Sequence, residues 1–567
     1  MFLTIVIFLF CALVILRLFI IQVLQHSFYA ALASGQHELY QKLFPKRGEI
    51  FVQDQFAKSG LFPIATNQDL NLVYAVPGEI KGSKDEIAKK LSEILALDEA
   101  EIKMRISKEN DLYEPLKHGV SDEIKTEIEK LNFQGIKFTT ESYRYYPEKE
   151  VGSHILGFVG FNGDEKKGQY GLEGYFEKEM AGKQGFLKAE KDAAGRWMTI
   201  GNTLLQEAED GDDIVLTIDH NIQYNACQKL SEAVVKHGAD GGSLIIMNPK
   251  TGEILAMCGA PDFDPNKYNE VQNIEVFKNP ATYSTYEPGS VFKPITMAAA
   301  LDLGLVTPNT TYEDTGEVKI MSYTIKNSDG KANGVQTMTN VLEKSLNTGA
   351  IFAVQKVGNE KFEEYVQKFG FGEKTGIQLD SESSGDISSL AKHKDIYSAT
   401  ASFGQGISVT PIQLIDAFGA IANQGKLMKP YIVKEIVKPN GFKIENKPTE
   451  IRQVISSKTA TTLSAMLVNV VRNGHGQKAG VPGYFVAGKT GTAQIPKKDG
   501  VGYEANLTIG TFCGFAPVDD PKFVMCVKVD IPRDVQWAES SAAPLFGDMA
   551  KYLLNYFQVP PTEEVEE

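Results

Sequence analysis

The sequence predicts an α+β protein with an N-terminal membrane helix, a mixed α/β region, and a C-terminal domain built on a five-stranded antiparallel sheet. Three observations predict this architecture. The chain begins with about two dozen mostly apolar residues, short strands and amphipathic helices follow to about residue 205, and five strand-like segments lie near the two ends of the remainder. Because helical segments separate these strands, we expect a sheet flanked by helices that carries an inserted helical lobe.

The first 24 residues are expected to form an uncleaved, single-pass transmembrane anchor. This stretch is long enough to cross a bilayer, and the Arg17 side chain can reach the headgroups. A cleaved signal peptide is the alternative, with a small-residue site at Ala31-Leu32-Ala33. The apolar run is too long for one, and no basic region precedes it. Basic residues follow the span, against the positive-inside tendency, so an extracytoplasmic location for the bulk of the chain depends on the chemistry below.

Composition and cysteine spacing restrict the function. The chain has 58 basic and 72 acidic residues, and no basic cluster is interleaved with aromatic residues, so nucleic acid is not an expected partner. The cysteines lie at no metal-ligand spacing, which favours buried thiols: Cys11, Cys227, Cys258, Cys513 and Cys526. Cys258 and Cys513 fall in predicted strands that can pair, and a disulfide between them is compatible with the sequence but not required.

Residues 25–210 are expected to form a non-catalytic domain. Amphipathic periodicity predicts helices at residues 84–97 and 121–131, and a strand is predicted at residues 135–140. These residues contain no catalytic constellation, which favours a spacer or partner-binding role.

Residues 211–558 are expected to form the second domain, followed by an acidic, disordered and solvated tail at residues 559–567. Its sheet is predicted from two hairpins and a separate strand: residues 243–248 with 253–259, residues 511–515 with 522–530, and residues 485–495. The flanking helices are predicted at residues 221–236 and 543–557. Residues 284–467 would form the inserted lobe, and a cleft between lobe and sheet is expected.

Ser290 is the candidate nucleophile. It follows Pro288 and Gly289, which mark a turn, and it opens an alanine-rich segment that predicts a buried helix. Lys293 follows three residues later, so both side chains project from one helical face. Burial and the positive end of the helix dipole favour a neutral lysine, which makes Lys293 the candidate base for the serine hydroxyl.

The same Ser-x-x-Lys spacing occurs twice more in unsuitable contexts. Ser328 lies in a polar turn beside Asn327, where no helix gives the two side chains a common face. Ser389 precedes a charged run that is typical of a solvated surface. Only Ser290 opens an apolar helix, and this context separates it from the other two serines.

Two further motifs accompany Ser290. Ser345 and Asn347 precede an apolar helix and, as alternate residues of a turn, can face one cleft; helix capping is the structural alternative for this pair. Lys489-Thr490-Gly491-Thr492 lies in a predicted strand, where small residues let an extended peptide pair with the backbone. The Lys-Thr-Gly triplet occurs twice more, once in a hairpin turn and once in a loop.

In this order and in these contexts, the three motifs resemble those of the penicillin-recognising acyl-serine enzymes. The chain as a whole resembles the class B penicillin-binding proteins, which are monofunctional peptidoglycan D,D-transpeptidases. The segments similar to the transpeptidase signatures are residues 287–290, 345–350, 404–406 and 487–494. The segments similar to the family's non-catalytic pedestal are residues 47–50, 144–147, 154–160 and 171–173.

The resemblance implies a mechanism through an acyl-serine intermediate. Ser290 would attack the penultimate D-alanine carbonyl of a stem peptide, with Lys293 as its base. Ser345 would relay a proton to the leaving amine, and Asn347 would orient the substrate amide.

The resemblance also assigns roles to the strand motif. Lys489 would supply positive potential, and Thr490 and Thr492, with Gly491 between them, would bind the terminal carboxylate. Backbone amides of Ser290 and Thr492 would form the oxyanion hole.

The implied ligands are peptidoglycan stem peptides, a lipid-linked precursor, and β-lactams trapped at the same serine, with no metal or cofactor. A membrane-embedded glycan polymerase is the implied partner, because the chain shows no glycosyltransferase region. A β-lactamase or D,D-carboxypeptidase of the same fold is one alternative, but no residue is assigned as the base that deacylation by water requires. A non-catalytic scaffold or β-lactam sensor is another, although sensors usually carry several membrane spans and only one is expected here.

Overall fold

The computed structural model describes residues 38–43, 45–108, 111, 113–162, 165–190, 204–497 and 502–563. Its contacts divide the chain into two compact units. The first comprises Met1–Gly48, Asn67–Tyr143 and Lys178–Asp212, and the second comprises Glu49–Thr66, Arg144–Glu177 and Asp213–Glu567. The expected membrane anchor, residues 1–24, lies outside the described residues. None of the helices within the described ranges is long and apolar enough to cross a bilayer.

In the first unit, three helices share a core with residues from three strands of a seven-stranded sheet. Ser83, Asp98 and Ser121 each cap one helix by accepting a backbone hydrogen bond: α3 (Lys84–Leu95), α4 (Glu99–Ile106) and α5 (Asp122–Lys130). The sheet residues come from β3 (Leu61–Ala75), β4 (Glu114–Val120) and β5 (Ile136–Tyr145). A separate sheet contains β1 (Glu38–Leu43), β8 (Gly185–Glu190) and β9 (Leu204–Gln206). The two helices and the strand predicted for this region are present.

The second unit is built on the predicted five-stranded antiparallel sheet, in the order β12-β11-β23-β22-β21. Its strands are β11 (Gly241–Met247), β12 (Ile254–Ala260), β21 (Ala487–Pro496), β22 (Tyr503–Ala516) and β23 (Phe523–Asp530). Strands from the two ends of the unit therefore meet where β11 pairs with β23. β21 is the last strand in this order, so within the described residues its outer edge is open to a further strand.

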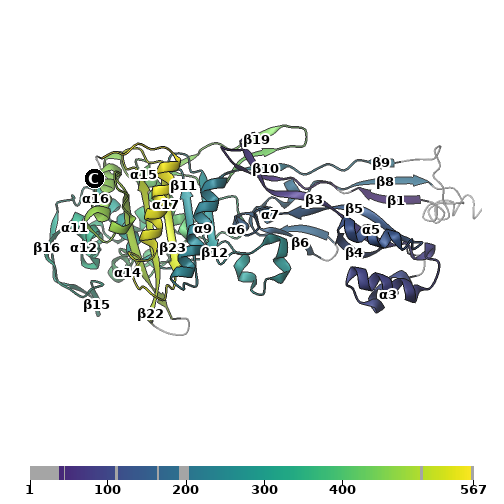
Figure 1. The fold of residues 1–567 in the computed structure, drawn as a ribbon. Helices are drawn as coiled ribbons and strands as arrows, with labels where there is room; N and C mark the ends of the chain where they lie inside the picture. Colours follow the sequence, from purple (N-terminus) through teal and green to yellow (C-terminus); the bar gives the residue numbers. More distant parts are fainter. Residues whose placement is uncertain are drawn as a thin grey trace, which may run out of the picture. The chain divides into compact units, whose positions relative to one another are not determined.

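Helices cover both faces of this sheet. α9 (His220–Lys236) and α17 (Ala542–Tyr556) pack together on one face, as Figure 1 shows, and their core includes Leu244 and Ile246 of β11. Side chains alternate along a strand, so Met247 points to the other face, where it meets Gly419 of α15 (Pro411–Ala422). The helices predicted to flank the sheet are confirmed.

An inserted lobe separates β12 from β21 along the chain. Besides α15 it contains α10 (Lys293–Asp302), α11 (Met338–Glu343), α12 (Asn347–Val357), α13 (Asn359–Lys368), α14 (Asp395–Ala401) and α16 (Ser457–Asn473). Two small antiparallel pairs lie between α10 and α11: β13 (Thr311–Asp314) with β16 (Gly334–Thr337), and β14 (Glu317–Ile320) with β15 (Tyr323–Lys326). The lobe is mostly helical, as predicted.

Segments from early in the chain also belong to the second unit. β2 (Ile50–Gln53) pairs in parallel with β10 (Asp213–Asp219), which in turn pairs with β18 (Val433–Val437). Arg144 Nε donates to Glu173 Oε1 at 2.6 Å, and Tyr146 donates to the same oxygen at 3.2 Å. This buried ion pair lies within two of the segments similar to the pedestal motifs.

Two disulfides replace four of the five buried thiols that the sequence favoured, and the fifth, Cys11, lies outside the described residues. Cys227 of α9 is bonded to Cys258 of β12, and Cys513 of β22 is bonded to Cys526 of β23. The pairing of Cys258 with Cys513 that the sequence left open is not formed. The first pair depends on how α9 packs against the sheet and the second on strand register, and neither follows from cysteine spacing.

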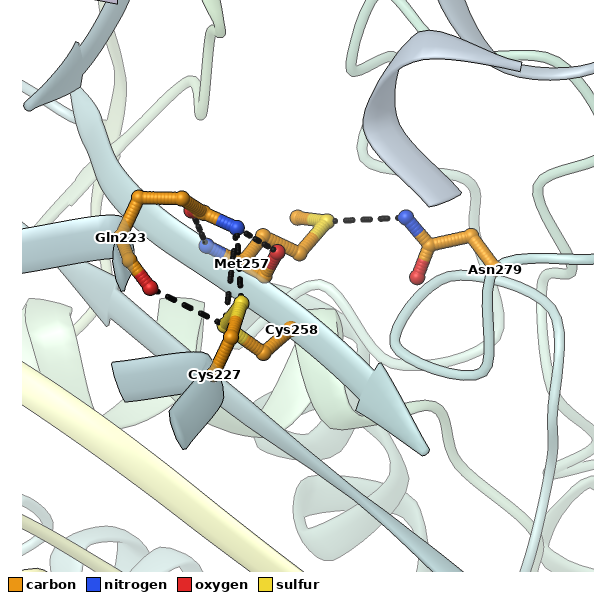
Figure 2. The surroundings of a disulfide bond; sticks show 5 residues. All are labelled: Gln223, Cys227, Met257, Cys258 and Asn279. Carbon is orange, nitrogen blue, oxygen red and sulfur yellow. Dashed lines mark hydrogen bonds between the residues drawn. A yellow bond between two sulfur atoms is a disulfide. The ribbon is translucent and has the colours of Figure 1, made fainter. Parts of the chain in front are cut away.

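Gln223 of α9 lies beside the first disulfide and ties the helix to β12 (Figure 2). Its Nε2 donates to the Met257 carbonyl oxygen at 2.9 Å, and the Met257 amide donates to Gln223 Oε1 at 2.9 Å. Asn279 Nδ2 approaches Met257 Sδ at 3.1 Å from the other side. The edge strand β12 is thus held by a covalent bond and by side-chain hydrogen bonds.

The start of the expected acidic tail is attached to the second unit. Tyr484 donates to the Val559 carbonyl oxygen at 2.7 Å, and the Thr562 amide donates to the Gly483 carbonyl oxygen at 2.9 Å. Residues 560–562 are nevertheless exposed to solvent, as the composition predicted, and residues 564–567 lie outside the described residues.

Candidate active site

Ser290 and Lys293 lie on consecutive turns at the start of α10. Gly289–Phe292 forms a 3-10 turn that runs directly into this helix. Three residues make one such turn, so the side chains of Ser290 and Lys293 are nearly in line. Pro294 falls in the first turn of α10, where its missing N–H removes no helical hydrogen bond. The local sequence therefore sets the common direction of the two side chains.

Two buried lysines converge on Ser345. Lys293 Nζ donates to the Ser345 carbonyl oxygen at 2.5 Å and to its Oγ at 3.3 Å. Lys489 Nζ donates to the same Oγ at 3.0 Å. The two lysines are only 1% and 0% exposed. One hydroxyl therefore bridges amines from the start of α10 and from β21.

Burial determines the charge of both lysines. Burial, and next the charge of Lys489, lowers the pKa of Lys293 well below its ordinary value. Burial also lowers the pKa of Lys489 to about 7, against an upward influence from Glu539. The positive charge of Lys489 opposes a second ammonium group beside it, which favours the neutral form of Lys293. A neutral amine at this position can accept a hydroxyl proton.

The backbone of Ser345 is strained. Its φ is 55°, in the left-handed region, which costs a residue with a Cβ about 1–2 kcal/mol. The turn is held from the α11 side, because the Leu346 amide donates to the Val341 carbonyl oxygen at 2.9 Å. Strain of this kind persists only where the surroundings hold it, and it concentrates at functional sites.

Asn347 donates through Nδ2 to the Lys326 carbonyl oxygen at 2.9 Å. The capping role considered for Ser345 and Asn347 is not observed, since Leu346 is the N-cap residue of α12 and makes no side-chain cap. Instead, Asn327 Oδ1 accepts hydrogen bonds from the first two amides of the helix at 3.0 and 3.2 Å. The cap comes from a residue 20 positions upstream.

β21 lies directly against the turn that carries Ser290. A Cβ on Gly491 would lie 2.8 Å from the Pro288 carbonyl oxygen, and a Cβ on Gly289 would lie 3.2 Å from the Thr492 carbonyl oxygen. The φ of Gly289 is 62°, which also favours glycine. The two backbones meet closely because these positions lack side chains, and this contact places Ser290 beside the strand motif.

The two threonines of the motif have different surroundings. Thr490 Oγ1 lies 3.4 Å from Lys489 Nζ and belongs to the lysine cluster. Thr492 Oγ1 accepts a hydrogen bond at 3.0 Å from the Ala538 amide, in the segment that follows β23. Glu539, the next residue of this segment, pairs with His475 Nδ1 at 2.8 Å. The post-β23 segment therefore borders the site.

A hollow of about 420 Å³ lies at the far end of β21. It is lined by Gln494, Ile495 and Pro496 of the strand, and also by Glu287 and Ser408. Glu287 Oε1 accepts from the Gly406 amide at 2.9 Å. The open edge of β21 and this hollow together give an extended peptide room to pair with the strand.

The structure gathers most of the predicted site residues. Hydrogen bonds join Lys293, Ser345, Lys489 and Thr490, and backbone packing places Ser290 beside Gly491 and Thr492. Asn347 lies on the Ser345 turn, but its amide is turned toward β15. Sequence reasoning missed Asn327 because it lies in the polar turn beside Ser328. The sequence did contain one signal for a distant cap: Leu346, at the start of the apolar helix, cannot cap it with its own side chain.

Two family models match the chain. The penicillin-binding protein transpeptidase domain matches residues 242–551, and the penicillin-binding protein dimerisation domain matches residues 42–216. The chain is 36% identical to stage V sporulation protein D of Bacillus subtilis (strain 168) over 523 residues, which cover 91% of this chain and 79% of that protein. It is 29% identical to the peptidoglycan D,D-transpeptidase FtsI homolog of Mesostigma viride over 577 residues, covering 96% and 94% of the two chains.

Solved structures match over the same extent. The crystal structure of penicillin binding protein 3 from Mycobacterium tuberculosis complexed with aztreonam has a TM-score of 0.71 and 27% identity, covering 93% of this chain and 100% of that one. The corresponding ampicillin complex has a TM-score of 0.71 and 27% identity, covering 92% and 98%.

Proposed function

This chain belongs to the penicillin-binding protein family as a class B peptidoglycan D,D-transpeptidase, and on that premise we propose that its chemistry proceeds through an acyl-enzyme at Ser290. The observation that carries this proposal is the convergence of Lys293 and Lys489 on the Ser345 hydroxyl. A nucleophile, a neutral amine and a relay hydroxyl on neighbouring segments are the groups that acyl transfer by serine requires.

Acylation begins with a proton transfer from the nucleophile. Neutral Lys293 Nζ takes the proton of Ser290 Oγ as this oxygen attacks the penultimate D-alanine carbonyl of a stem peptide. When the tetrahedral intermediate collapses, the C–N bond breaks and the leaving D-alanine amine takes the proton of Ser345 Oγ. Protonated Lys293 then returns a proton to Ser345. The original proton of Ser345 thus departs with D-alanine, the proton lost by Ser290 ends on Ser345, and the acyl group remains on Ser290.

The strand motif binds and polarises the substrate. Lys489 supplies positive potential, and Thr490 and Thr492, on either side of Gly491, bind the terminal carboxylate. Thr492 must then exchange its hydrogen bond from Ala538, or share its hydroxyl between the two partners. Backbone amides of Ser290 and Thr492 form the oxyanion hole, where the loss of one donor typically costs about 3 kcal/mol of transition-state stabilisation.

Asn347 orients the substrate amide after releasing the Lys326 carbonyl oxygen. An amine of a second stem peptide then attacks the ester and forms the cross-link, which regenerates the Ser290 hydroxyl. β-Lactams acylate the same serine and are released slowly.

Residues 1–24 anchor the enzyme in the membrane by a single pass, with the bulk of the chain extracytoplasmic. Residues 25–210 form the non-catalytic pedestal, and residues 211–558 the transpeptidase domain. The lipid-linked precursor is polymerised by a separate membrane-embedded enzyme. Support comes from the apolar N-terminal sequence and from the two matched family models.

Intact-mass analysis after exposure to penicillin tests the proposal. The full-length protein should gain the mass of one penicillin, and the adduct should map to the peptide that contains Ser290. Ser290→Ala should gain no mass and should form no cross-links from lipid-linked substrate. Ser328→Ala, which alters the exposed serine of another Ser-x-x-Lys spacing, is the matched control and should be acylated normally.

The lifetime of the adduct separates the proposal from its alternatives. A transpeptidase should hold the penicilloyl group for hours. A β-lactamase or carboxypeptidase would hydrolyse the acyl-enzyme and turn over further penicillin. An adduct on another residue, or unchanged cross-linking by Ser290→Ala, would overturn the assignment of the nucleophile.

A further inference from the structure

The helix that follows Ser345 is capped by a residue from a distant turn. The first backbone amides of a helix have no intrahelical acceptor, and a Ser, Thr, Asn or Asp side chain at the N-cap usually satisfies them. Leu346, the N-cap of α12, has no such group. Asn327 Oδ1 takes this role and accepts from the Asn347 amide at 3.0 Å and the Thr348 amide at 3.2 Å.

Asp314, at the end of β13, holds Asn327 in place. Asn327 Nδ2 lies 3.0 Å from both carboxylate oxygens, and the two side chains are 4% and 1% exposed. Thr348 Oγ1 donates to Asp314 Oδ1 at 2.8 Å, and Asn333 Nδ2 donates to Oδ2 at 2.7 Å. The first turn of α12 is therefore held twice, by Asn327 through its amides and by Asp314 through the Thr348 hydroxyl.

The network keeps a negative charge behind the helix N-terminus. Burial raises the pKa of Asp314, but hydrogen bonds, led by those from Asn333 and Thr348, outweigh burial and hold the pKa below its ordinary value. An anion near the positive end of a helix is stabilising. Asn327 transmits this interaction, because it donates to the carboxylate and accepts from the helix.

We propose that Asn327 is a positioning residue for acylation, and that Asp314 acts through it to fix the turn that carries Ser345. This inference rests on the proposed function of Ser345 as a proton relay. Ser345 in this turn is strained, with a φ of 55°. A hydrogen bond to α11 holds one end of the turn, and the start of α12 must hold the other end. If the start of α12 shifts, Ser345 Oγ moves relative to both lysines.

A small displacement has a large effect on this chemistry. Ser345 Oγ lies 3.3 Å from Lys293 Nζ and 3.0 Å from Lys489 Nζ, and both contacts lengthen if the turn relaxes. Misplacement of a reacting group by about 1 Å can cost about 100-fold in rate. The contribution of Asn327 should therefore appear in the chemical step rather than in substrate affinity.

Asn333 provides a matched control. Both asparagine amides donate to Asp314, but only Asn327 contacts the amides of α12. The test measures the acylation of the full-length variants Asn327→Ala and Asn333→Ala by a fluorescent penicillin over a range of concentrations. This separates the rate constant at saturation from the concentration that gives half the maximal rate.

Asn327→Ala should lower the saturating rate about 10- to 100-fold and leave the half-saturating concentration within about threefold of the wild type. Asn333→Ala retains the backbone amide that donates to Asp314 Oδ2 at 3.1 Å, and it should lower the saturating rate much less than Asn327→Ala does. Urea unfolding of both variants compares their stabilities. A wild-type saturating rate for Asn327→Ala, or an equal loss for Asn333→Ala, would overturn the inference.

If Asn327→Ala does not fold, a double variant that exchanges the Asp and Asn side chains of positions 314 and 327 tests the positioning role. Asn327→Asp retains an acceptor for the two helix amides but places a second carboxylate against Asp314. Combining it with Asp314→Asn restores one donor and one acceptor between the two side chains. The double variant should acylate at least tenfold faster than Asn327→Asp alone, and no recovery would contradict the inference.

Acylation of the wild-type protein distinguishes a failure of this inference from a failure of the proposed function. Absence of acylation at Ser290 in the wild type would overturn both. Normal acylation of the wild type together with an unaffected Asn327→Ala would remove only the positioning role.

Discussion

Two buried clusters of ionisable side chains in the second unit differ in whether opposite charges are paired. Arg144 and Glu173 form an ion pair at 2.6 Å, with side chains that are 3% and 0% exposed. Lys293 and Lys489 are as deeply buried, but they meet across the Ser345 hydroxyl rather than a carboxylate. Within the described residues, neither lysine forms an ion pair. One cluster compensates its charge, and the other does not.

The difference explains which cluster is reactive. A buried charge is costly unless it is paired and hydrogen-bonded, so an uncompensated lysine lowers its free energy by losing its proton. Glu173 neutralises the guanidinium charge of Arg144 through this ion pair. Lys293 lacks such a partner, so burial lowers its pKa well below the ordinary value and favours the neutral amine that can act as a base. Burial thus accompanies a stabilising ion pair at Arg144 and Glu173, whereas at Lys293 it favours the neutral amine that catalysis needs.

Lys293→Met should have the largest effect on activity and little effect on folding. Loss of the base should lower the rate of acylation by penicillin about 10²- to 10⁴-fold. Replacing a buried amine that lacks an ion-pair partner by an apolar side chain of similar length should leave the free energy of unfolding unchanged or raise it. Fluorescent-penicillin labelling and urea unfolding measure the two quantities. A loss of several kcal/mol of stability would show that Lys293 is compensated after all.

Arg144→Met should have the opposite profile. The variant leaves the buried Glu173 carboxylate without its cation, and breaking such a pair typically costs about 3–5 kcal/mol of stability. Acylation of the folded protein should stay within about twofold of the wild type. The double variant Arg144→Met/Glu173→Gln is the control and should recover part of the lost stability. A large loss of acylation rate in the folded single variant would mean that the two clusters are coupled.

Glu539→Gln should have the smallest effect and acts on the lysine cluster alone. Lys489 loses its positive charge as the pH rises through its pKa of about 7, and Glu539 raises that pKa. Without the carboxylate the pKa falls, so the decline of acylation at alkaline pH should begin at a lower pH, by less than about 1 unit because the group is exposed.

The pH profile of acylation measures this shift. Asp534→Asn is the control, because Asp534 lies in the same post-β23 segment but pairs with His237 at 2.9 Å. Its profile should match the wild type. A shift toward higher pH in Glu539→Gln would contradict the electrostatic role of Glu539.

Sequence patterns located the five strands of the catalytic sheet, both flanking helices and the segments that carry Ser290, Ser345 and Lys489. These features depend on local periodicity, on turn residues and on helix starts, which are encoded within a few neighbouring residues. The capping interpretation of Ser345 and Asn347 was wrong because a cap can come from any part of the chain that packs nearby. The disulfides were missed for the same reason, since Cys227 meets Cys258 only after a helix docks on the sheet.

The amino-acid order alone determined which residues have the chemistry for acyl transfer and which segments form helices or strands. It did not determine that Asn327 completes α12, that Ser345 lies between two amines, or that Thr492 contacts the Ala538 amide. Those relations join residues that are distant in sequence, and they arise only when burial brings the segments together. Because the lowered lysine pKa values come from that same burial, the reactivity of the site belongs to the tertiary structure.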